Sequence, residues 1–319
     1  MATVATNSAR YERLRRAATI RNALEHLIIL TSPDGLEKAR ERDRQLIWRR
    51  AAARAIAELM RDLEDSVPIT TLFREARSAY DRKGLTEKRD APFPVRDPLD
   101  EGVEEEIEAE IAERLADIGD DVVMTSLALV ARSALRSMAL RLGLSRSLPG
   151  GWDDSPEAAR RALENTFPEQ ADTLRRMLRD AREQYVRRAA VTITNAAHPS
   201  VQTPVDDARQ FALDRVRRLT EQQARQMTET LSSEAANGTQ RKVMVDAGVE
   251  MRRLNTMEDN RVCPVCLDNA AEGFIPLSRP YPSGHMAPPI HPNCRCTETG
   301  NSRGTMTPPY LQRAEAQGG

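Results

Sequence analysis

The sequence predicts a mainly α-helical protein in which an extended helical body carries a small C-terminal α+β module. Two observations lead to this fold class. Charged residues make up 30% of the 319 residues and aromatic residues only 4%, a composition that is typical of helix-rich chains. All four cysteines lie between Cys263 and Cys296, and clustering of this kind is typical of a metal or redox site.

The helical body is predicted from apolar residues that recur at helical spacing. A linker with prolines and charges is expected over residues 86–98. Beyond it, an acidic helix places Ile107, Ile111 and Leu115 on one face. The expected helices cover 8–30, 36–63, 69–83, 100–117, 121–144, a segment from Pro156, a segment from Pro168 towards Thr194, and 205–236.

The apolar stretch 121–144 is expected to be the central helix of a bundle. Arg132, Arg136 and Arg141 interrupt it, and no apolar run approaches the roughly 18 to 20 residues of a membrane span. The first sixteen residues are polar and lack the apolar core of a secretory signal. We therefore expect no membrane contact, and synthesis in a reducing cytoplasm, where cysteines more often bind metal than form disulfides.

Breaks in the pattern divide the chain into three predicted regions. Pro149–Gly151 ends the apolar helix, and a new helix starts with Ser155 as N-cap and Pro156 in its first turn. A second break covers residues 197–204. The regions are an N-terminal basic helical region over 1–90, a helical bundle over 91–204, and a C-terminal domain with the Cys/His cluster over 205–319.

The charges balance overall but not locally. The chain has 47 basic and 48 acidic residues, which argues against a whole-surface attraction to nucleic acid. Residues 10–54 are rich in Lys and Arg, and residues 97–121 are rich in Asp and Glu. We expect both stretches to be solvated helix faces. Docking surfaces for other subunits or for DNA remain the alternative.

The cysteines have the spacing of a structural zinc site, which takes four ligands, usually two from each of two tight turns. Cys263-Pro-Val-Cys266 supplies the first pair. The second comes from His291, Cys294 and Cys296, of which Cys294 and Cys296 would share one side of an extended strand. The predicted set is the first pair, His291, and either Cys294 or Cys296. We predict that zinc clips the C-terminal module, which would lose most of its fold without metal.

Spacing leaves some other uses of these residues open and excludes others. Two disulfides or four free thiols remain alternatives, and His285 is a further candidate ligand. A zinc deaminase is excluded, because no His is followed two residues later by Glu and the proline lies inside the cysteine pair. The His-Glu-x-x-His motif of metalloproteases is absent. A thioredoxin-like use of Cys-Pro-Val-Cys would leave Cys294 and Cys296 unexplained.

Two runs around the cysteines form a longer signature. Asn255–Cys266 contains Asp-x-Arg-x-Cys-x-x-Cys, and Pro289–Cys296 reads Pro-x-His-Pro-Asn-Cys-Arg-Cys, with Gly273 and Phe274 in the spacer. This pattern resembles the phage Mu F-like head morphogenesis family. The likeness covers about residues 215–300, roughly a quarter of the chain.

The upstream half of the signature departs from the family pattern. The usual Arg-Thr-Glu run is spread over Arg225–Glu229, and Leu254 stands where a bulky aromatic residue is common. Asp259 and Arg261 are expected to form a local turn, with a salt bridge that orients the first cysteine pair as the alternative.

The resemblance implies a minor capsid protein of a tailed phage or prophage, a structural protein and not an enzyme. Such a protein would act in head morphogenesis at or near the portal vertex, and in DNA packaging or ejection. The implied partners are the portal protein, the major capsid or scaffold protein, and packaged DNA, and the implied location is the phage head. Two alternatives stay open: a DNA-binding head protein that uses the N-terminal basic helices, and a head-carried enzyme of unknown chemistry.

Overall fold

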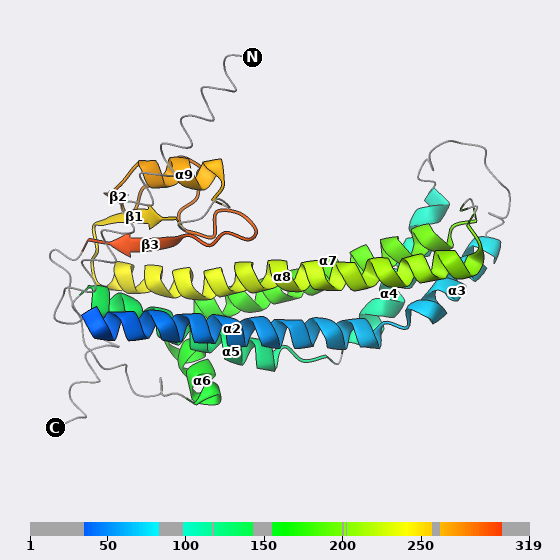
Figure 1. The fold of residues 1–319 in the computed structure, drawn as a ribbon, viewed down its shortest axis with the longest axis horizontal. Helices are drawn as coiled ribbons and strands as arrows, with labels where there is room; N and C mark the ends of the chain where they lie inside the picture. Colours follow the sequence, from blue (N-terminus) through cyan, green and yellow to red (C-terminus); the bar gives the residue numbers. More distant parts are fainter. Residues whose placement is uncertain are drawn as a thin grey trace, which may run out of the picture. The chain divides into compact units, whose positions relative to one another are not determined.

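A computed structural model describes residues 35–82, 98–116, 118–142, 155–199, 201, 203–256 and 262–301, with side chains omitted for 35–48 and 98–100 (Figure 1). The helices are α2 Gly35–Ser66, α3 Ile69–Arg82, α4 Pro98–Leu115, α5 Asp121–Arg141, α6 Pro156–Thr166, α7 Pro168–Ala197, α8 Val205–Asp246 and α9 Pro264–Ala271. The strands are β1 Met251–Asn255, β2 Ile275–Pro276 and β3 Thr297–Gly300. The predicted fold class, mainly α with a small C-terminal α+β module, is confirmed.

Several sequence predictions fall outside the described residues. These are the helix over 8–30, the linker over 86–98 except Pro98, which begins α4, the break at Pro149–Gly151, and the roles of Asp259 and Arg261. The basic stretch over 10–54 is described only in part, so its role as a solvated face stays a prediction.

Contacts divide the described chain into two compact units. One unit includes the described residues up to Ala52, within Val122–Arg175 and from Thr228 onwards, and the other includes those within Ala53–Asp121 and Arg176–Met227. Both units are assembled from segments that are far apart in the sequence. The three predicted ranges 1–90, 91–204 and 205–319 stay a prediction.

In the second unit, the acidic helix α4 buries one stripe and exposes its charges. Ile107, Ile111 and Leu115 are buried as the spacing predicts. Arg182 donates a hydrogen bond to the Leu115 carbonyl at 2.5 Å and pairs with Asp120 at 3.1 Å. A cation at this place satisfies a carbonyl at the end of the helix, where the helix dipole is negative.

In the first unit, α6 begins as its sequence predicts. Ser155 has an extended backbone and its Oγ accepts a hydrogen bond from the Ala158 N–H at 3.3 Å. Pro156 occupies the first turn, where its missing N–H costs no hydrogen bond. The predicted N-cap is therefore confirmed.

Helix α5 is the apolar core helix of this unit. By length and composition it is the one described helix that could cross a membrane. However, most of its apolar stretch is buried inside the protein, and even Arg132 is only 5% exposed. A mostly buried core helix passes the same composition criterion, so α5 gives only weak evidence for a membrane span.

Helix α8 runs ten residues past its predicted end, to Asp246. The predicted helix ends just before Asn237-Gly238, a stretch that is poor in large apolar residues. In the structure this stretch is buried, and Gly238 faces Gln170 so closely that a Cβ would meet its amide at 2.0–2.4 Å. Tertiary packing outweighs the low intrinsic helix propensity of Gly and Asn here.

The C-terminal module is a three-stranded antiparallel sheet of order β2-β1-β3. Arg252 is opposite Gly300 and Leu254 is opposite Glu298. Figure 1 shows α9 on one side of the sheet and the end of α8 on the other. The module core is formed by Leu254, Val262, Cys266, Leu267, Ala270, Ile275, Tyr281, Ile290, Cys294 and Cys296.

Candidate metal centre

The first half of the cluster is built at the start of α9. Cys263 is the N-cap, with φ −75° and ψ 157°, and Pro264 follows in the first turn. The Cys266 N–H donates to Cys263 Sγ at 3.4 Å. The helix start therefore holds both sulfurs on one side of a tight turn, as the Cys-x-x-Cys spacing predicts.

The second half is a tight turn in the loop before β3. The Cys294 N–H donates to the His291 carbonyl at 3.1 Å, and Asn293 has φ 63°. Proline followed by a left-handed Asn is the sequence pattern of a type II turn. The Asn293 N–H also donates to Thr230 Oγ1 on α8 at 3.3 Å. The turn thus places His291 and Cys294 next to each other and attaches them to α8.

The two turns bring all five predicted donors together in two groups that share Cys266. His291 Nε2 lies 3.1 Å from Cys263 Sγ and 3.3 Å from Cys266 Sγ. Cys266 Sγ lies 4.0 Å from Cys294 Sγ. Within each group, Cys263–Cys266–His291 and Cys266–Cys294–Cys296, the donor atoms are within 4.8 Å of one another. Ligands of a tetrahedral zinc are separated by about 3.5–3.8 Å, given its bond lengths. The geometry therefore fits a metal ion.

A backbone contact fixes the tautomer of His291. Its Nδ1 is 2.8 Å from the Pro292 carbonyl oxygen, which can only accept a hydrogen bond. Nδ1 must therefore carry the proton, and Nε2 presents its lone pair to the two sulfurs. Metal-binding histidines are commonly oriented in this way by a hydrogen bond from the other ring nitrogen.

Cys296 and Glu298 continue the inward-facing side of the segment that leads into β3. Cys294, Cys296 and Glu298 are buried, while Arg295 between the cysteines is half-buried, as the period of two predicts. Asn237 on α8 donates to the Cys296 carbonyl at 2.9 Å. The sheet pairing and this hydrogen bond hold the strand against α8.

The buried sulfurs influence one another's ionisation. Hydrogen bonds from the Cys266 and Cys296 thiols lower the pKa of Cys294. Hydrogen bonding to Cys294 is in turn the largest cause that raises the pKa of Cys266, and burial adds to it. Ionisation is therefore favoured at Cys294 over Cys266. Bound metal would replace the protons of its ligands.

The weaker candidate, His285, lies outside both donor groups. It is exposed, and its Nδ1 lies 3.2 Å from Ser283 Oγ. Ser283 is itself attached to Asn269 of α9 by two hydrogen bonds, one to its hydroxyl at 2.8 Å and one from its backbone N–H at 3.1 Å. His285 is thus part of the loop surface.

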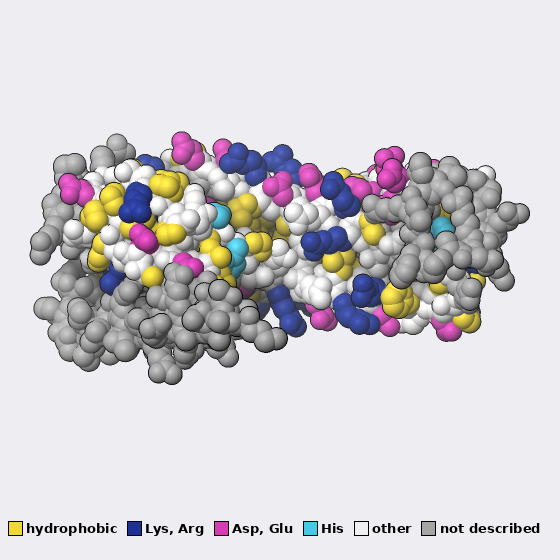
Figure 2. Space-filling model, turned by 90° about the horizontal axis from the view of Figure 1, so that it is seen from above, with side chains coloured by type: hydrophobic (Ala, Val, Ile, Leu, Met, Phe, Trp, Pro, Cys, Tyr) yellow, Lys and Arg dark blue, Asp and Glu magenta, His cyan; other side chains and the backbone are white. Residues whose placement is uncertain are grey.

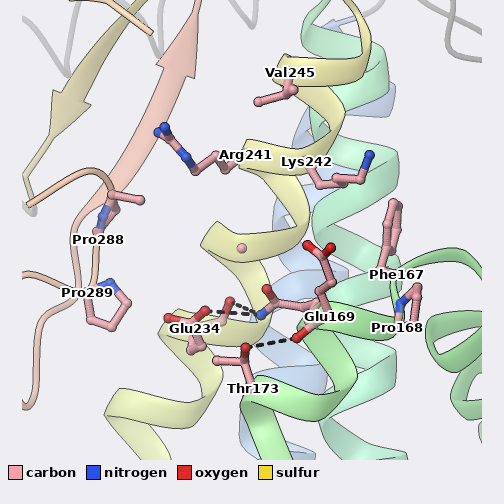
Figure 3. A pocket seen from close by; sticks show the side chains of 13 residues that line it. Phe167, Pro168, Glu169, Thr173, Glu234, Arg241, Lys242, Val245, Pro288 and Pro289 are labelled. Atoms are coloured by element: carbon pink, nitrogen blue, oxygen red, sulfur yellow. Dashed lines mark hydrogen bonds between the residues drawn. The ribbon is translucent and has the colours of Figure 1, made fainter. Parts of the chain in front are cut away.

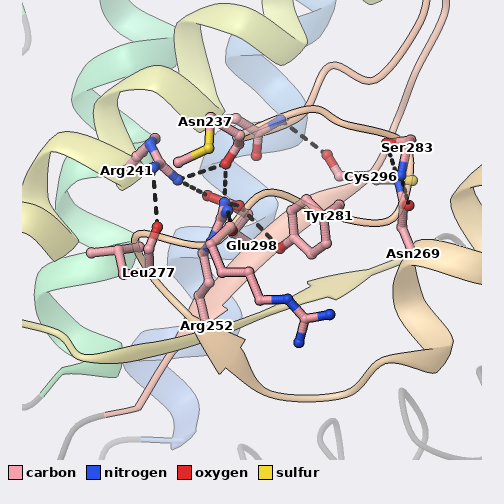
Figure 4. Close-up of polar contacts among 11 residues, drawn as sticks. Asn237, Arg241, Arg252, Asn269, Leu277, Tyr281, Ser283, Cys296 and Glu298 are labelled. Carbon is pink, nitrogen blue, oxygen red and sulfur yellow. Dashed lines mark hydrogen bonds and ion pairs between the residues drawn. The ribbon is translucent and has the colours of Figure 1, made fainter.

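A buried ionic network that sequence reasoning missed supports the cluster from the side of the sheet (Figure 4). Arg252 of β1 and Glu298 of β3 are both fully buried and form a hydrogen-bonded ion pair. The Tyr281 hydroxyl donates to Glu298 Oε1 at 3.0 Å, and Arg241 of α8 is 3.7 Å from Glu298 Oε2. Burial raises the pKa of Glu298, although both arginines oppose this shift.

The same arginines hold the proline-rich loop between β2 and the second turn. Arg241 donates to the carbonyls of Met286 at 2.8 Å and Leu277 at 3.3 Å. Arg252 donates to Met286 and, at 2.7 Å, to the Arg279 carbonyl. These bonds satisfy carbonyls that a proline-rich loop cannot pair within itself. The sequence gives no local signal for them, because the partners are 27 to 45 residues apart.

A cavity of about 460 Å³ lies beside the module, in the same unit (Figure 3). Its wall is formed by the start of α7, the end of α8 and the loop at Ala287–Pro289. Glu169 and Glu234 both line it, and Glu234 accepts a hydrogen bond from the Gln170 amide at 3.3 Å. Burial raises the pKa of Glu234, although this hydrogen bond lowers it.

No family model, curated protein or solved structure matches this chain. The functional conclusion therefore depends on the cluster and on the signature residues that build it. Candidate metal-binding groups are present at Cys263–Cys266–His291 and Cys266–Cys294–Cys296.

Proposed function

We propose that the protein is a structural minor capsid protein of a tailed phage or prophage, with a C-terminal module that is stabilised by one zinc ion. It would act in head morphogenesis at or near the portal vertex, and in DNA packaging or ejection. The observation that carries this proposal is the match between the signature and the cluster. The Cys-x-x-Cys and His-Pro-Asn-Cys segments of the Mu F-like signature are those that form the two turns with the candidate metal ligands.

Five residues of the second run contribute to the geometry of this site. His291 and Cys294 supply donors, while Pro292 and Asn293 make the turn between them. The Cys296 carbonyl attaches the run to α8. An unrelated chain could bind a metal with the ligand spacing alone. The presence of the turn residues between the ligands therefore supports membership of a family that shares the same run.

Zinc is the metal that the donor set favours. The donors are thiols and one imidazole, with no carboxylate in either group, and soft sulfur ligands select zinc over magnesium, calcium or manganese. Cys266, Cys294 and Cys296 are all buried. Four protein ligands in a closed site leave no open position for substrate, which is the arrangement of structural zinc. We therefore propose a structural and not a catalytic ion.

The cavity is one place in the described structure where the enzymatic alternative could be located. A hydrolase could use a pair of carboxylates, and Glu169 and Glu234 line this wall. Its basic residues are engaged elsewhere: Arg241 with Glu298 and the loop carbonyls, and Lys242 with Asp246 at 2.5 Å. We propose that the cavity is structural.

Most of the N-terminal basic residues that the DNA-binding alternative would use lie outside the described side chains. Figure 2 shows Lys and Arg interspersed with Asp and Glu on the face that it presents, without a separate basic stripe. Packaged DNA remains a proposed contact of the head protein, alongside portal and capsid or scaffold proteins. The proposed location is the phage head, after synthesis in the host cytoplasm.

Co-expression with the portal protein encoded in the same phage genome tests the assignment. We expect the chain to co-purify with portal assemblies or procapsids, and to be recovered from purified heads in low copy. Recovery with DNA alone, with a steep loss between low and moderate salt, would favour the DNA-binding alternative. Absence from both portal assemblies and heads would overturn the proposal.

A further inference from the structure

The cluster has one donor more than a tetrahedral zinc can use. Cys263, Cys266 and His291 form one group, and Cys294 and Cys296 each lie near the shared Cys266. Zinc in a structural site takes four ligands. One cysteine must therefore remain outside the first coordination sphere, and the local geometry indicates which one.

The two halves of the site repeat a single pattern. Cys263-Pro-Val-Cys266 and His291-Pro-Asn-Cys294 each read donor, Pro, any residue, Cys. In each, the N–H of the second Cys donates back to the first residue of the turn: to Cys263 Sγ at 3.4 Å and to the His291 carbonyl at 3.1 Å. Each tight turn thus presents a pair of donors three residues apart. Cys296 lies outside this repeat, in the extended segment that leads into β3.

Contacts around Cys296 fix its backbone in the extended segment. Its carbonyl accepts a hydrogen bond from Asn237, and the residues that follow it pair with β1. Both sulfurs of the second half lie near the first turn: Cys294 Sγ is 4.0 Å from Cys266 Sγ, and Cys296 Sγ is within 4.8 Å of it. The choice between them therefore follows from the repeated turn, which presents His291 and Cys294 as a pair.

We infer that the zinc ligands are Cys263, Cys266, His291 and Cys294, and that Cys296 lies beside them without binding the ion. This inference rests on the zinc site proposed above. Cys296 Sγ lies within 4.8 Å of both Cys266 Sγ and Cys294 Sγ, so its S–H can donate to a zinc-bound thiolate. It is a positioning residue for the ligands and not a ligand.

Paired substitutions test the assignment on the full-length protein. X-ray absorption at the zinc edge reports three sulfurs and one nitrogen in the wild type on this inference. Cys296→Ala should keep one zinc and the same three-sulfur shell, with tenfold weaker binding at most. Cys294→Ala should lose one sulfur from the shell and bind zinc at least 100-fold more weakly in competition with a chelator. The cobalt-substituted wild type and Cys296→Ala should have equal thiolate charge-transfer intensity.

Three results would overturn the inference. These are a two-sulfur shell in Cys296→Ala, a retained three-sulfur shell in Cys294→Ala, and a four-sulfur shell without nitrogen in the wild type. The wild-type spectra decide the donor set even where a variant fails to fold, and far-ultraviolet circular dichroism identifies such a variant. Wild-type protein without any zinc would instead contradict the zinc proposal itself, and portal binding tests the head-assembly role separately.

Discussion

At the scale of single residues, the Cys/His cluster and the buried ionic network around Glu298 depend on different kinds of contact. Cys-x-x-Cys and the His-Pro-Asn-Cys turn are local patterns, so spacing alone predicts the five donors that the structure brings together. The ion pair of Arg252 and Glu298 joins residues 46 apart. Only the pairing of β1 with β3 brings them together, and no local pattern encodes that pairing.

Removing one partner of this ion pair should destabilise the module strongly. Glu298→Gln would leave Arg252 as a charge without an anionic partner in a site where both side chains are fully buried, and such changes typically cost about 3–5 kcal/mol. Replacing both by apolar residues, as in Arg252→Met with Glu298→Leu, should cost less than the single change. Urea unfolding of the three proteins compares the free energies. A single variant as stable as wild type would contradict the account.

Glu234 should make stability depend on pH. Burial raises its pKa above the ordinary value of 4.5, so the folded state holds its proton more tightly than the unfolded state. The contribution of Glu234 to the free energy of unfolding is therefore fully present below pH about 4.5 and is lost as pH rises through the folded-state pKa. Glu234→Gln keeps the oxygen that accepts from Gln170 and removes this loss. We expect the variant to be more stable at pH 7 and to have a flatter pH profile in thermal unfolding, with Glu169→Gln as the control.

At the scale of elements, helix periodicity predicts most of what is observed. The stripe of α4, the N-cap of α6 and the start of α7 all follow from local sequence. The end of α8 does not, because its small polar residues Ser232, Ser233, Asn237 and Thr239 are buried by tertiary contacts. Local propensity cannot report that a helix face is covered by a sheet and by another helix.

Gly238 gives a test of that packing. A Cβ there would meet the Gln170 amide at 2.0–2.4 Å, so Gly238→Ala should displace Gln170 from the Glu234 carbonyl, which it now reaches at 2.9 Å. We expect the free energy of unfolding to fall by about 1 kcal/mol or more, because the hydrogen bond is lost and the packing is strained. In a Gln170→Ala background the same change should instead stabilise the protein by up to about 1 kcal/mol, because Ala has a higher helix propensity than Gly. Equal effects in both backgrounds would show that the close approach is unimportant.

At the scale of the whole molecule, the sequence predicts the mainly helical class and the C-terminal α+β module. It does not foretell that each compact unit is assembled from separate segments, with the long helices α2, α7 and α8 contributing to both. Periodicity identifies which face of a helix is buried, and carries no information on which distant segment covers it. The biological role depends on the signature around the cysteines.

Metal removal should affect the module and spare most of the helices. Structural zinc in small modules contributes about 10–16 kcal/mol at neutral pH, so chelation should expose the amides of β1, β3 and α9 to hydrogen exchange. The core of α5 consists of buried apolar side chains without cysteine, and its protection should remain. Uniform loss of protection along the chain would contradict this division.

Zinc content tests the central claim most directly. The full-length protein, purified under reducing conditions without added metal or chelator, is analysed by mass spectrometry of the metal and by amino-acid analysis of the same sample. The account predicts one zinc per chain, and far less than one in a Cys263→Ser, Cys266→Ser variant. Wild-type protein with well-formed β1 and β3 but no stoichiometric zinc would contradict it.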